Sequence, residues 1–126
     1  MDRKKILVVD DEEEIVKLVA KRLKGAGFDV ITAGLGRQAV MKAVENPPDL
    51  ILMDIMLPDI EGSDAVNLLN EHESTRIIPI IFLSGIINKE EGSPGTEIKV
   101  AGRMYPAIGK PFTFEELLTL VKKMII

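Results

Sequence analysis

The chain has 126 residues and a formal net charge of −4, with 46% hydrophobic and 29% charged residues. This length and composition indicate one soluble globular domain and exclude a disordered chain. The sequence has no cysteine, which excludes disulfides and thiol chemistry and is consistent with a reducing cytoplasm. Its apolar stretches are far shorter than the ~18 residues of a membrane span. The negative charge, with no basic cluster beyond short Lys/Arg runs, argues against nucleic-acid binding.

The first elements are a strand, a helix and a second strand. Residues 6–9 are four consecutive apolar residues, which predict a short strand buried on both faces. Residues 15–23 carry apolar side chains at helical spacing, and the Gly-Ala-Gly sequence at 25–27 predicts the end of that helix. Residues 28–33 then predict a second strand.

The same alternation continues through the middle of the chain. Residues 36–46 have alanines and valines four residues apart, and two prolines at 47–48 end this second helix. The apolar run at 49–54 predicts a third buried strand. A third helix follows Gly62, and residues 78–84 predict a fourth strand.

Residues 85–109 interrupt the pattern, because they hold five glycines and two prolines in 25 residues. A regular fourth helix is therefore not predicted there, and Ile98 and Val100 fit either a helix or a strand. The last helix has a clear start, since Thr113 and Glu116 match a capping box.

Taken together, the elements predict an α/β fold: a single doubly wound, parallel five-stranded sheet with helices on both faces and an irregular fourth-helix region. The fifth strand lies in the segment before Lys110. In such folds ligands bind beyond the carboxyl ends of the strands, where loops lead into helices.

Polar residues stand at those strand ends. Asp10 and Asp11 follow the first strand, Asp54 ends the third, Ser84 ends the fourth and Lys110 follows the fifth. Each has an ordinary structural alternative: a helix cap for the aspartates, a loop or turn position, or a solvated lysine. Residues 12–14 are three glutamates, which we interpret as a solvated first helical turn.

The combination of these residues favours a phosphate and metal site. Three carboxylates at one sheet edge repel one another, and a hard divalent cation such as Mg²⁺ removes that conflict. A lysine and a hydroxyl beside them suit a phosphoryl group, whose transfer needs mainly positioning and charge neutralisation. An aspartate carboxylate can accept such a group.

Four stretches resemble the receiver domains of bacterial two-component response regulators. They are ILVVDDE at 6–12, DLILMDIMLPDIEG at 49–62, IPIIFLSG at 78–85 and KPF at 110–112, in the family's order. The resemblance spans essentially the whole chain. It implies that residues 1–126 form one receiver domain with a flavodoxin-like fold. It also implies a cytoplasmic phosphoacceptor switch, which catalyses only its own phosphoryl transfer and dephosphorylation and is not a metabolic enzyme.

The resemblance also implies residue roles. Asp54 would accept a phosphoryl group from the phosphohistidine of a histidine kinase or phosphotransfer protein. The ligands of Mg²⁺ would be Asp10, Asp11, Asp54 and the backbone carbonyl of Met56. Ser84 and Lys110 would bind phosphoryl oxygens, and the Lys110–Pro111 peptide would be cis.

One position departs from the family pattern. Receivers commonly carry an aromatic residue three positions before the lysine, but here that residue is Ala107, and Tyr105 lies two positions earlier. The departure concerns the conformational readout, which the resemblance places on the face of the last helices, and not phosphorylation itself. The chain then ends without an output domain, so it is either a stand-alone receiver or a fragment of a larger regulator.

Other functions fit less well. A protein-binding scaffold with this fold would not need mutually repelling carboxylates. A flavin carrier would need a phosphate-binding loop after the first strand, where this chain is acidic. A haloacid-dehalogenase-like phosphatase would require a second aspartate where Met56 stands.

Overall fold

A computed structural model of the chain describes residues 3–85 and 97–125. The strands are β1 (Lys5–Val9), β2 (Asp29–Ala33), β3 (Leu50–Asp54), β4 (Ile80–Ser84), β5 (Glu97–Val100) and β6 (Arg103–Gly109). The helices are α1 (Glu13–Gly25), α2 (Gly36–Glu45), α3 (Gly62–Asn70), α4 (Glu73–Arg76) and α5 (Phe114–Ile125). Among the described residues no helix is long and apolar enough to cross a bilayer.

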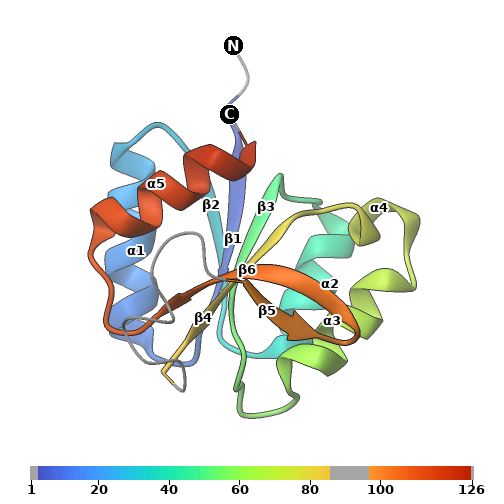
Figure 1. Cartoon of the computed structure of the whole chain (residues 1–126). Coiled ribbons are helices and arrows are strands. Elements are labelled where there is room, and N and C mark those ends of the chain that lie inside the picture. Colours follow the sequence, from blue (N-terminus) through green and yellow to red (C-terminus); the bar gives the residue numbers. More distant parts are fainter. Residues whose placement is uncertain (1–2, 86–96, 126) are drawn as a thin grey trace.

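The strands form one sheet in the order β2-β1-β3-β4-β6-β5 (Figure 1). The first five of these are parallel neighbours, which confirms the predicted doubly wound α/β architecture. The sheet has one strand more than the five predicted, because β5 pairs antiparallel with β6 at the edge. The prediction counted only strands that alternate with helices, whereas β5 and β6 are joined by a hairpin turn with no helix between them.

A two-residue turn creates this extra strand. Val100 and Arg103 are paired, so only Ala101 and Gly102 connect β5 to β6. Both residues have positive φ, 51° and 83°, which is the backbone of a type I′ hairpin turn. Of the two alternatives for Ile98 and Val100, the strand is therefore the observed one.

The fourth-helix region is only partly described. Residues 86–96 lie outside the described residues, and 97–109 form the hairpin instead of a helix. The short α4 was not predicted. It follows α3 directly and spans only four residues.

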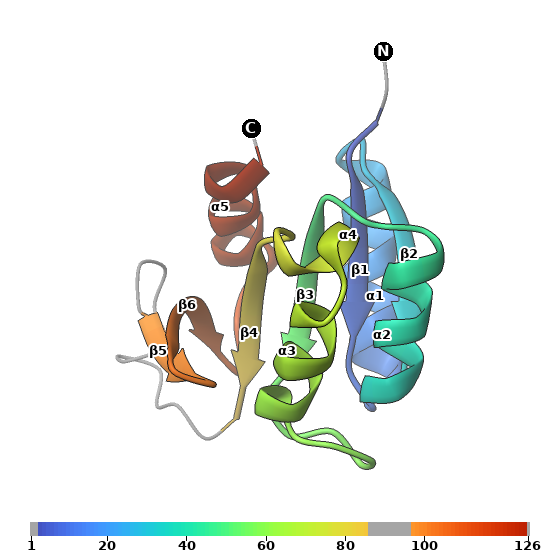
Figure 2. The same ribbon diagram turned by 90° about the vertical axis from the view of Figure 1, so that its right-hand side faces the viewer.

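Helices cover both faces of the sheet, with α1 and α5 on one face and α2, α3 and α4 on the other (Figures 1 and 2). The central strands β1, β3 and β4 are buried along most of their length, which explains their uninterrupted apolar sequences. Alternate side chains of these strands enter two separate apolar clusters. On β1, Leu7 belongs to the α2 and α3 side, whereas Val8 belongs to the α1 and α5 side.

The start of α5 agrees with its sequence signal. The hydroxyl of Thr113 accepts the backbone N–H of Glu116 at 3.1 Å, as expected of the residue that caps a helix. This helix follows directly on the segment that carries Lys110, so its start helps to fix the carboxyl edge of the sheet.

Candidate functional site

Three aspartates meet at the carboxyl ends of the central strands. Asp10 follows β1, Asp11 is the next residue, and Asp54 is the last residue of β3. One carboxylate oxygen from each lies within 4.8 Å of the others. Asp10 and Asp54 are buried, with 1% and 8% of their surface exposed, whereas Asp11 is exposed. The site thus presents one solvent-facing and two inward-facing carboxylates.

Lys110 is the cation of this cluster. Its Nζ lies 2.6 Å from Oδ2 of Asp10 and 3.0 Å from Oδ2 of Asp54. Burial alone would lower the pKa of the lysine, but its contacts with the two aspartates outweigh that effect and raise the pKa above its usual value. Lys110 therefore stays charged at neutral pH.

The backbone holds Lys110 against the end of β4. Its N–H donates to the carbonyl of Ser84 at 2.9 Å, and the Lys110–Pro111 peptide is cis. Ser84 itself is buried and follows Leu83, whose strand partner is Asp54. The two neighbouring strand ends therefore bring the hydroxyl of Ser84 to the edge of the sheet that carries Asp54 and Lys110.

A fourth carboxylate, Glu12, also reaches the lysine. Its Oε1 lies 3.2 Å from Nζ of Lys110. The interpretation of Glu12 as merely part of a solvated helical turn was wrong in this respect, because a partner 98 residues away in the chain pairs with it. No local pattern in the sequence indicates that contact.

Each buried aspartate is also fixed by its own backbone. Oδ1 of Asp10 accepts the N–H of Glu12 at 3.0 Å, and Oδ1 of Asp54 accepts the N–H of Met56 at 3.1 Å. Aspartate commonly bonds the backbone two residues on in this way. In both cases the second oxygen is left to face Lys110.

The loop after Asp54 is fastened to the start of α2, which sequence reasoning missed. The carboxylate of Asp59 accepts the N–H groups of Gly36 at 2.8 Å and Arg37 at 3.0 Å. Slight burial acts to raise the pKa of Asp59, but these backbone hydrogen bonds lower it below its usual value. A Cβ at Gly36 would collide with the side chain of Ile60 in the same loop. The position of the loop is therefore set by α2 as well as by β3.

The donor set suits a hard divalent cation. Oδ2 of Asp10 is buried and accepts no well-aligned hydrogen bond from the described residues, so its charge is offset chiefly by the ion pair with Lys110. Lys110 pairs with three carboxylates, from Asp10, Glu12 and Asp54, and Asp11 adds a fourth to the cluster. An oxygen-rich cluster with this excess of negative charge has the chemistry that Mg²⁺ prefers.

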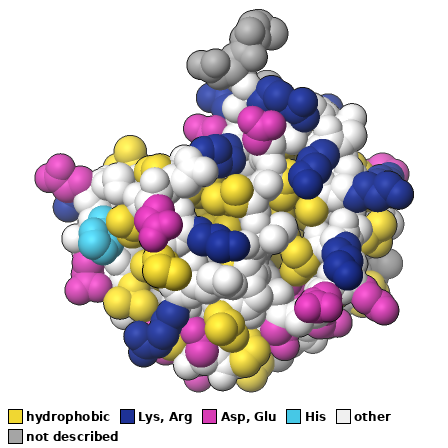
Figure 3. All heavy atoms as spheres, turned by 180° about the vertical axis from the view of Figure 1, so that it is seen from behind, with side chains coloured by type: hydrophobic (Ala, Val, Ile, Leu, Met, Phe, Trp, Pro, Cys, Tyr) yellow, Lys and Arg dark blue, Asp and Glu magenta, His cyan; other side chains and the backbone are white. Residues whose placement is uncertain are grey.

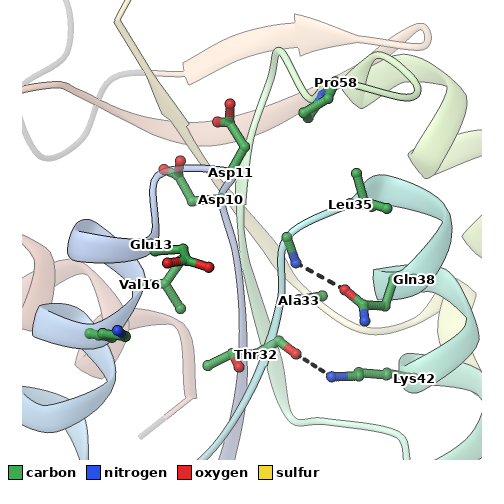
Figure 4. Close-up of a pocket in the computed structure, with 12 residues that line it drawn as sticks. Asp10, Asp11, Glu13, Val16, Thr32, Ala33, Leu35, Gln38, Lys42 and Pro58 are labelled. Atoms are coloured by element: carbon green, nitrogen blue, oxygen red, sulfur yellow. Dashed lines mark hydrogen bonds between the residues drawn. The ribbon is translucent and has the colours of Figure 1, made fainter.

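A cavity of about 540 Å³ opens beside the exposed member of the cluster. Figure 4 shows Asp10, Asp11 and Glu13 along one side of it and Leu35 and Gln38 along the other. The acidic cluster is thus open to solvent on the side of α2, and a small ion or phosphoryl group can reach Asp11 without movement of the fold.

The position that carries an aromatic residue in the family pattern is occupied by Ala107 of β6. Ala107 is buried and pairs with Phe82 of β4. Tyr105 lies on the same side of β6, and its ring meets that of Phe82 edge to face, with centroids 5.4 Å apart. The aromatic contact is therefore with the core strand and lies farther from Lys110 than the family pattern implies.

These features agree with comparisons to known proteins. The family model for the response regulator receiver domain matches residues 6–122, and the chain belongs to this family. A curated relative is the alkaline phosphatase synthesis transcriptional regulatory protein PhoP of Bacillus subtilis, 38% identical over 97% of this chain. The match covers 48% of PhoP, so the chain spans about half the length of that relative. Protein PilG of Pseudomonas aeruginosa is 34% identical, and the match covers 96% of this chain and 87% of PilG.

Solved structures show the same fold. The chemotaxis response regulator CheY4 of Vibrio cholerae has a TM-score of 0.83 and 30% identity, with 98% of this chain and 99% of CheY4 covered. The receiver domain of the sensor histidine kinase PA1611 of Pseudomonas aeruginosa has a TM-score of 0.78 and 26% identity, with 98% of each chain covered. That structure has a magnesium ion coordinated in its active-site cleft. The chain is thus a receiver domain of the two-component response regulators.

Proposed function

We propose that residues 1–126 form one receiver domain that acts as a cytoplasmic phosphoacceptor switch. Asp54 would accept a phosphoryl group from the phosphohistidine of a histidine kinase or phosphotransfer protein. The observation that carries this proposal is the setting of Asp54: it ends a buried strand, contacts Lys110, and shares the acidic cluster with Asp10 and Asp11.

The residues that would hold Mg²⁺ are Asp10, Asp11, Asp54 and the backbone carbonyl of Met56. When bound, the ion would supply positive charge against the phosphoryl oxygens. The excess of carboxylates over cations in the cluster supports this assignment, as does the magnesium ion in the related PA1611 receiver.

The chain's own groups would carry the transfer. An oxygen of the Asp54 carboxylate forms a bond to phosphorus while the bond from phosphorus to the histidine nitrogen breaks. The nitrogen keeps the electron pair, and the ring leaves as neutral imidazole because its other nitrogen carries a proton. Lys110 offsets the negative charge that gathers on the phosphoryl oxygens, and the hydroxyl of Ser84 donates a hydrogen bond to one of them. Later hydrolysis by water returns the free aspartate.

A groove beside Lys110 supports docking of the phosphodonor. It has a volume of about 450 Å³ and is lined largely by apolar side chains of α1 and of the segment after β6, including Ile15, Leu18 and Phe112. Leu18 is 60% exposed, and together with Ile15 and Phe112 it gives the groove an apolar lining that another protein can cover. The histidine of the donor would then enter next to the acidic cluster.

Beryllofluoride, a mimic of the phosphoryl group, provides the test. With Mg²⁺ it should shift the amide NMR signals of the strand ends around Asp54. The Asp54→Asn variant should show no such shift and should accept no phosphate from a phosphorylated kinase. Asp29→Asn, which makes the same chemical change at the opposite end of the sheet, should behave like the parent. If Mg²⁺ does not bind at millimolar concentration and Asp54→Asn is indistinguishable from the parent, the chain is a scaffold and the proposal fails.

A further inference from the structure

A row of lysines lies along the outer edge of the sheet and reaches the acidic cluster only at one end. Lys17, Lys21 and Lys24 come from α1, and Lys42 comes from α2. They line three adjoining cavities that share Thr32 of the edge strand β2. Figure 3 shows this face, where dark blue side chains flank a central strip of backbone and hydrophobic atoms. A chain with a net charge of −4 thus carries a basic groove at one edge.

The lysines of this groove are not paired with carboxylates of the described residues. In residues 3–85 and 97–125, no carboxylate forms an ion pair with any of these four lysines. Lys42 instead donates to the backbone carbonyl of Thr32 at 2.6 Å (Figure 4). Asp10, Asp11 and Glu13 line the first cavity and Glu45 lines another, whereas the cavity beside Lys17, Lys21 and Lys24 has no carboxylate in its lining. The middle of the groove therefore attracts anions.

The floor of the groove is an open strand edge. The strand β2 pairs with β1 alone and ends the sheet on this side. The N–H of Asp29 donates to the carbonyl of Lys4, just before β1, and the carbonyl of Ala33 accepts the N–H of Asp10, just after it. Because alternate residues of a parallel strand face opposite neighbours, the backbone groups of Val30 and Thr32 face outward. Among residues 3–85 and 97–125, the carbonyl of Thr32 accepts Lys42, and the other outward-facing backbone groups of Val30 and Thr32 have no hydrogen bond and can pair with another strand.

The side chains of β2 suit the same partner. Val30 and Ile31 are half-buried and belong to the apolar clusters on opposite faces of the sheet. An added strand would therefore place successive side chains alternately toward α1 and toward α2. Acidic side chains on such a strand would reach the lysines on either side. A polyanion without a peptide backbone would interact with the lysines through charge alone and could not pair with β2.

We propose that the groove between α1 and α2 binds an extended acidic polypeptide segment, which pairs with β2 and neutralises Lys17, Lys21, Lys24 and Lys42. Edge pairing of this kind gives affinity through backbone hydrogen bonds and specificity through alternate side chains. None of these four lysines pairs with Asp54, so the groove can be tested separately from phosphoryl transfer, although one of its cavities also touches Asp10 and Asp11.

The probe is a fluorescein-labelled short peptide of alternating Glu and Val, measured by anisotropy on the full chain. The double variant Lys21→Glu and Lys24→Glu should weaken binding about tenfold, because each change turns attraction into repulsion. Lys122→Glu with Lys123→Glu, the same change on exposed residues of α5, should leave binding unaltered. Bound peptide should also slow hydrogen exchange of the Val30 and Thr32 amides.

Two further probes, an N-methylated peptide and a single-stranded DNA oligonucleotide, distinguish strand pairing from binding by charge alone. A peptide of the same sequence with alternate backbone nitrogens methylated should bind much more weakly, because it cannot pair along its whole edge. Three results would overturn the proposal: no binding of the acidic peptide at millimolar concentration, equal loss in both double variants, or binding without protection of the Val30 and Thr32 amides. Tighter binding of a single-stranded DNA oligonucleotide of equal charge, abolished by the same α1 variant, would assign the groove to nucleic acid instead.

Discussion

At the scale of single residues, the site depends on one lysine shared among several carboxylates. Lys110 contacts Asp10, Glu12 and Asp54, and Asp10 is almost fully buried. Removing the cation would leave a buried carboxylate without its counter-charge, which is far more costly than losing an exposed ion pair. Lys110 therefore stabilises the fold, in addition to its proposed role at the phosphoryl group.

We expect Lys110→Ala to lower the free energy of unfolding by about 3 kcal/mol at neutral pH without metal, the usual cost of breaking a buried pair. Mg²⁺ should restore part of this loss, because a bound cation would again face Asp10. Urea denaturation with and without Mg²⁺ measures both effects, and Lys122→Ala serves as the control for an exposed lysine. A loss equal to that of the control would show that the buried charge is compensated in another way.

Asp59 gives a residue-scale prediction about pH. The pKa of Asp59 in the folded chain lies below its usual value, so its stabilising effect is present above the pKa of an unfolded aspartate, about 3.9, and is lost as pH falls through the folded value. At pH 7 we expect Asp59→Asn to cost about 0.5 kcal/mol, as for an exposed charge near a helix start.

The difference between Asp59→Asn and the parent should shrink as the solution is acidified below pH 4, which denaturation at a series of pH values will show. A difference that stays constant over this range would mean that the amide and the carboxylate cap α2 equally well.

At the scale of elements, the loop between Asp54 and α3 packs tightly against the start of α2. A methyl group at Gly36 would strike Ile60, whereas the space around Gly25 at the end of α1 is open. The loop between Asp54 and α3 therefore cannot move away from its place without disturbing the start of α2, where Asp59 is bound.

Gly36→Ala should destabilise the chain by about 1–3 kcal/mol, as overpacking does, and should also weaken Mg²⁺ binding by moving the loop that holds Met56. Gly25→Ala is the matched control and should be neutral in both measurements. Thermal denaturation gives the first quantity and a Mg²⁺ titration the second. Unchanged Mg²⁺ affinity in Gly36→Ala would separate the packing of this loop from metal binding.

Much of the fold was predictable because its signals are local. The buried strands read as apolar runs, and Gly62 and the glycines at 25–27 mark helix boundaries. The strand β5 was only one of two alternatives for Ile98 and Val100, since an Ala-Gly turn is a weak hairpin signal and glycines and prolines dominate the surrounding residues. The meeting of Asp10, Asp11 and Asp54 was predictable because the carboxyl ends of parallel strands lie at the same edge of a sheet. The contacts of Glu12 and Asp59 were not predictable, because each joins segments that only the folded chain brings together.

At the scale of the whole molecule, we expect metal binding at the acidic cluster to raise global stability. We expect Mg²⁺ at ten times its dissociation constant to stabilise the chain by about 1.4 kcal/mol, because the ion binds only the folded state. This corresponds to a rise in Tm of about 3–6 °C for a chain of this size. Scanning calorimetry in EDTA and in Mg²⁺ tests this, with Asp11→Asn as the variant that should respond least. An equal rise in that variant would place the binding elsewhere.

The division of the core into two clusters has a consequence for combined substitutions. Leu7 and Val8 are adjacent in the chain, yet they lie on opposite faces of the sheet and pack against different helices. Cavities made by shortening both side chains would be lined by different atoms and would relax separately, so their energetic costs should sum with little interaction. Pairs within one cluster, such as Leu7 with Ile51, share a cavity wall and should depart from simple addition. Closeness along the backbone is therefore a poor guide to which core residues of this protein depend on each other.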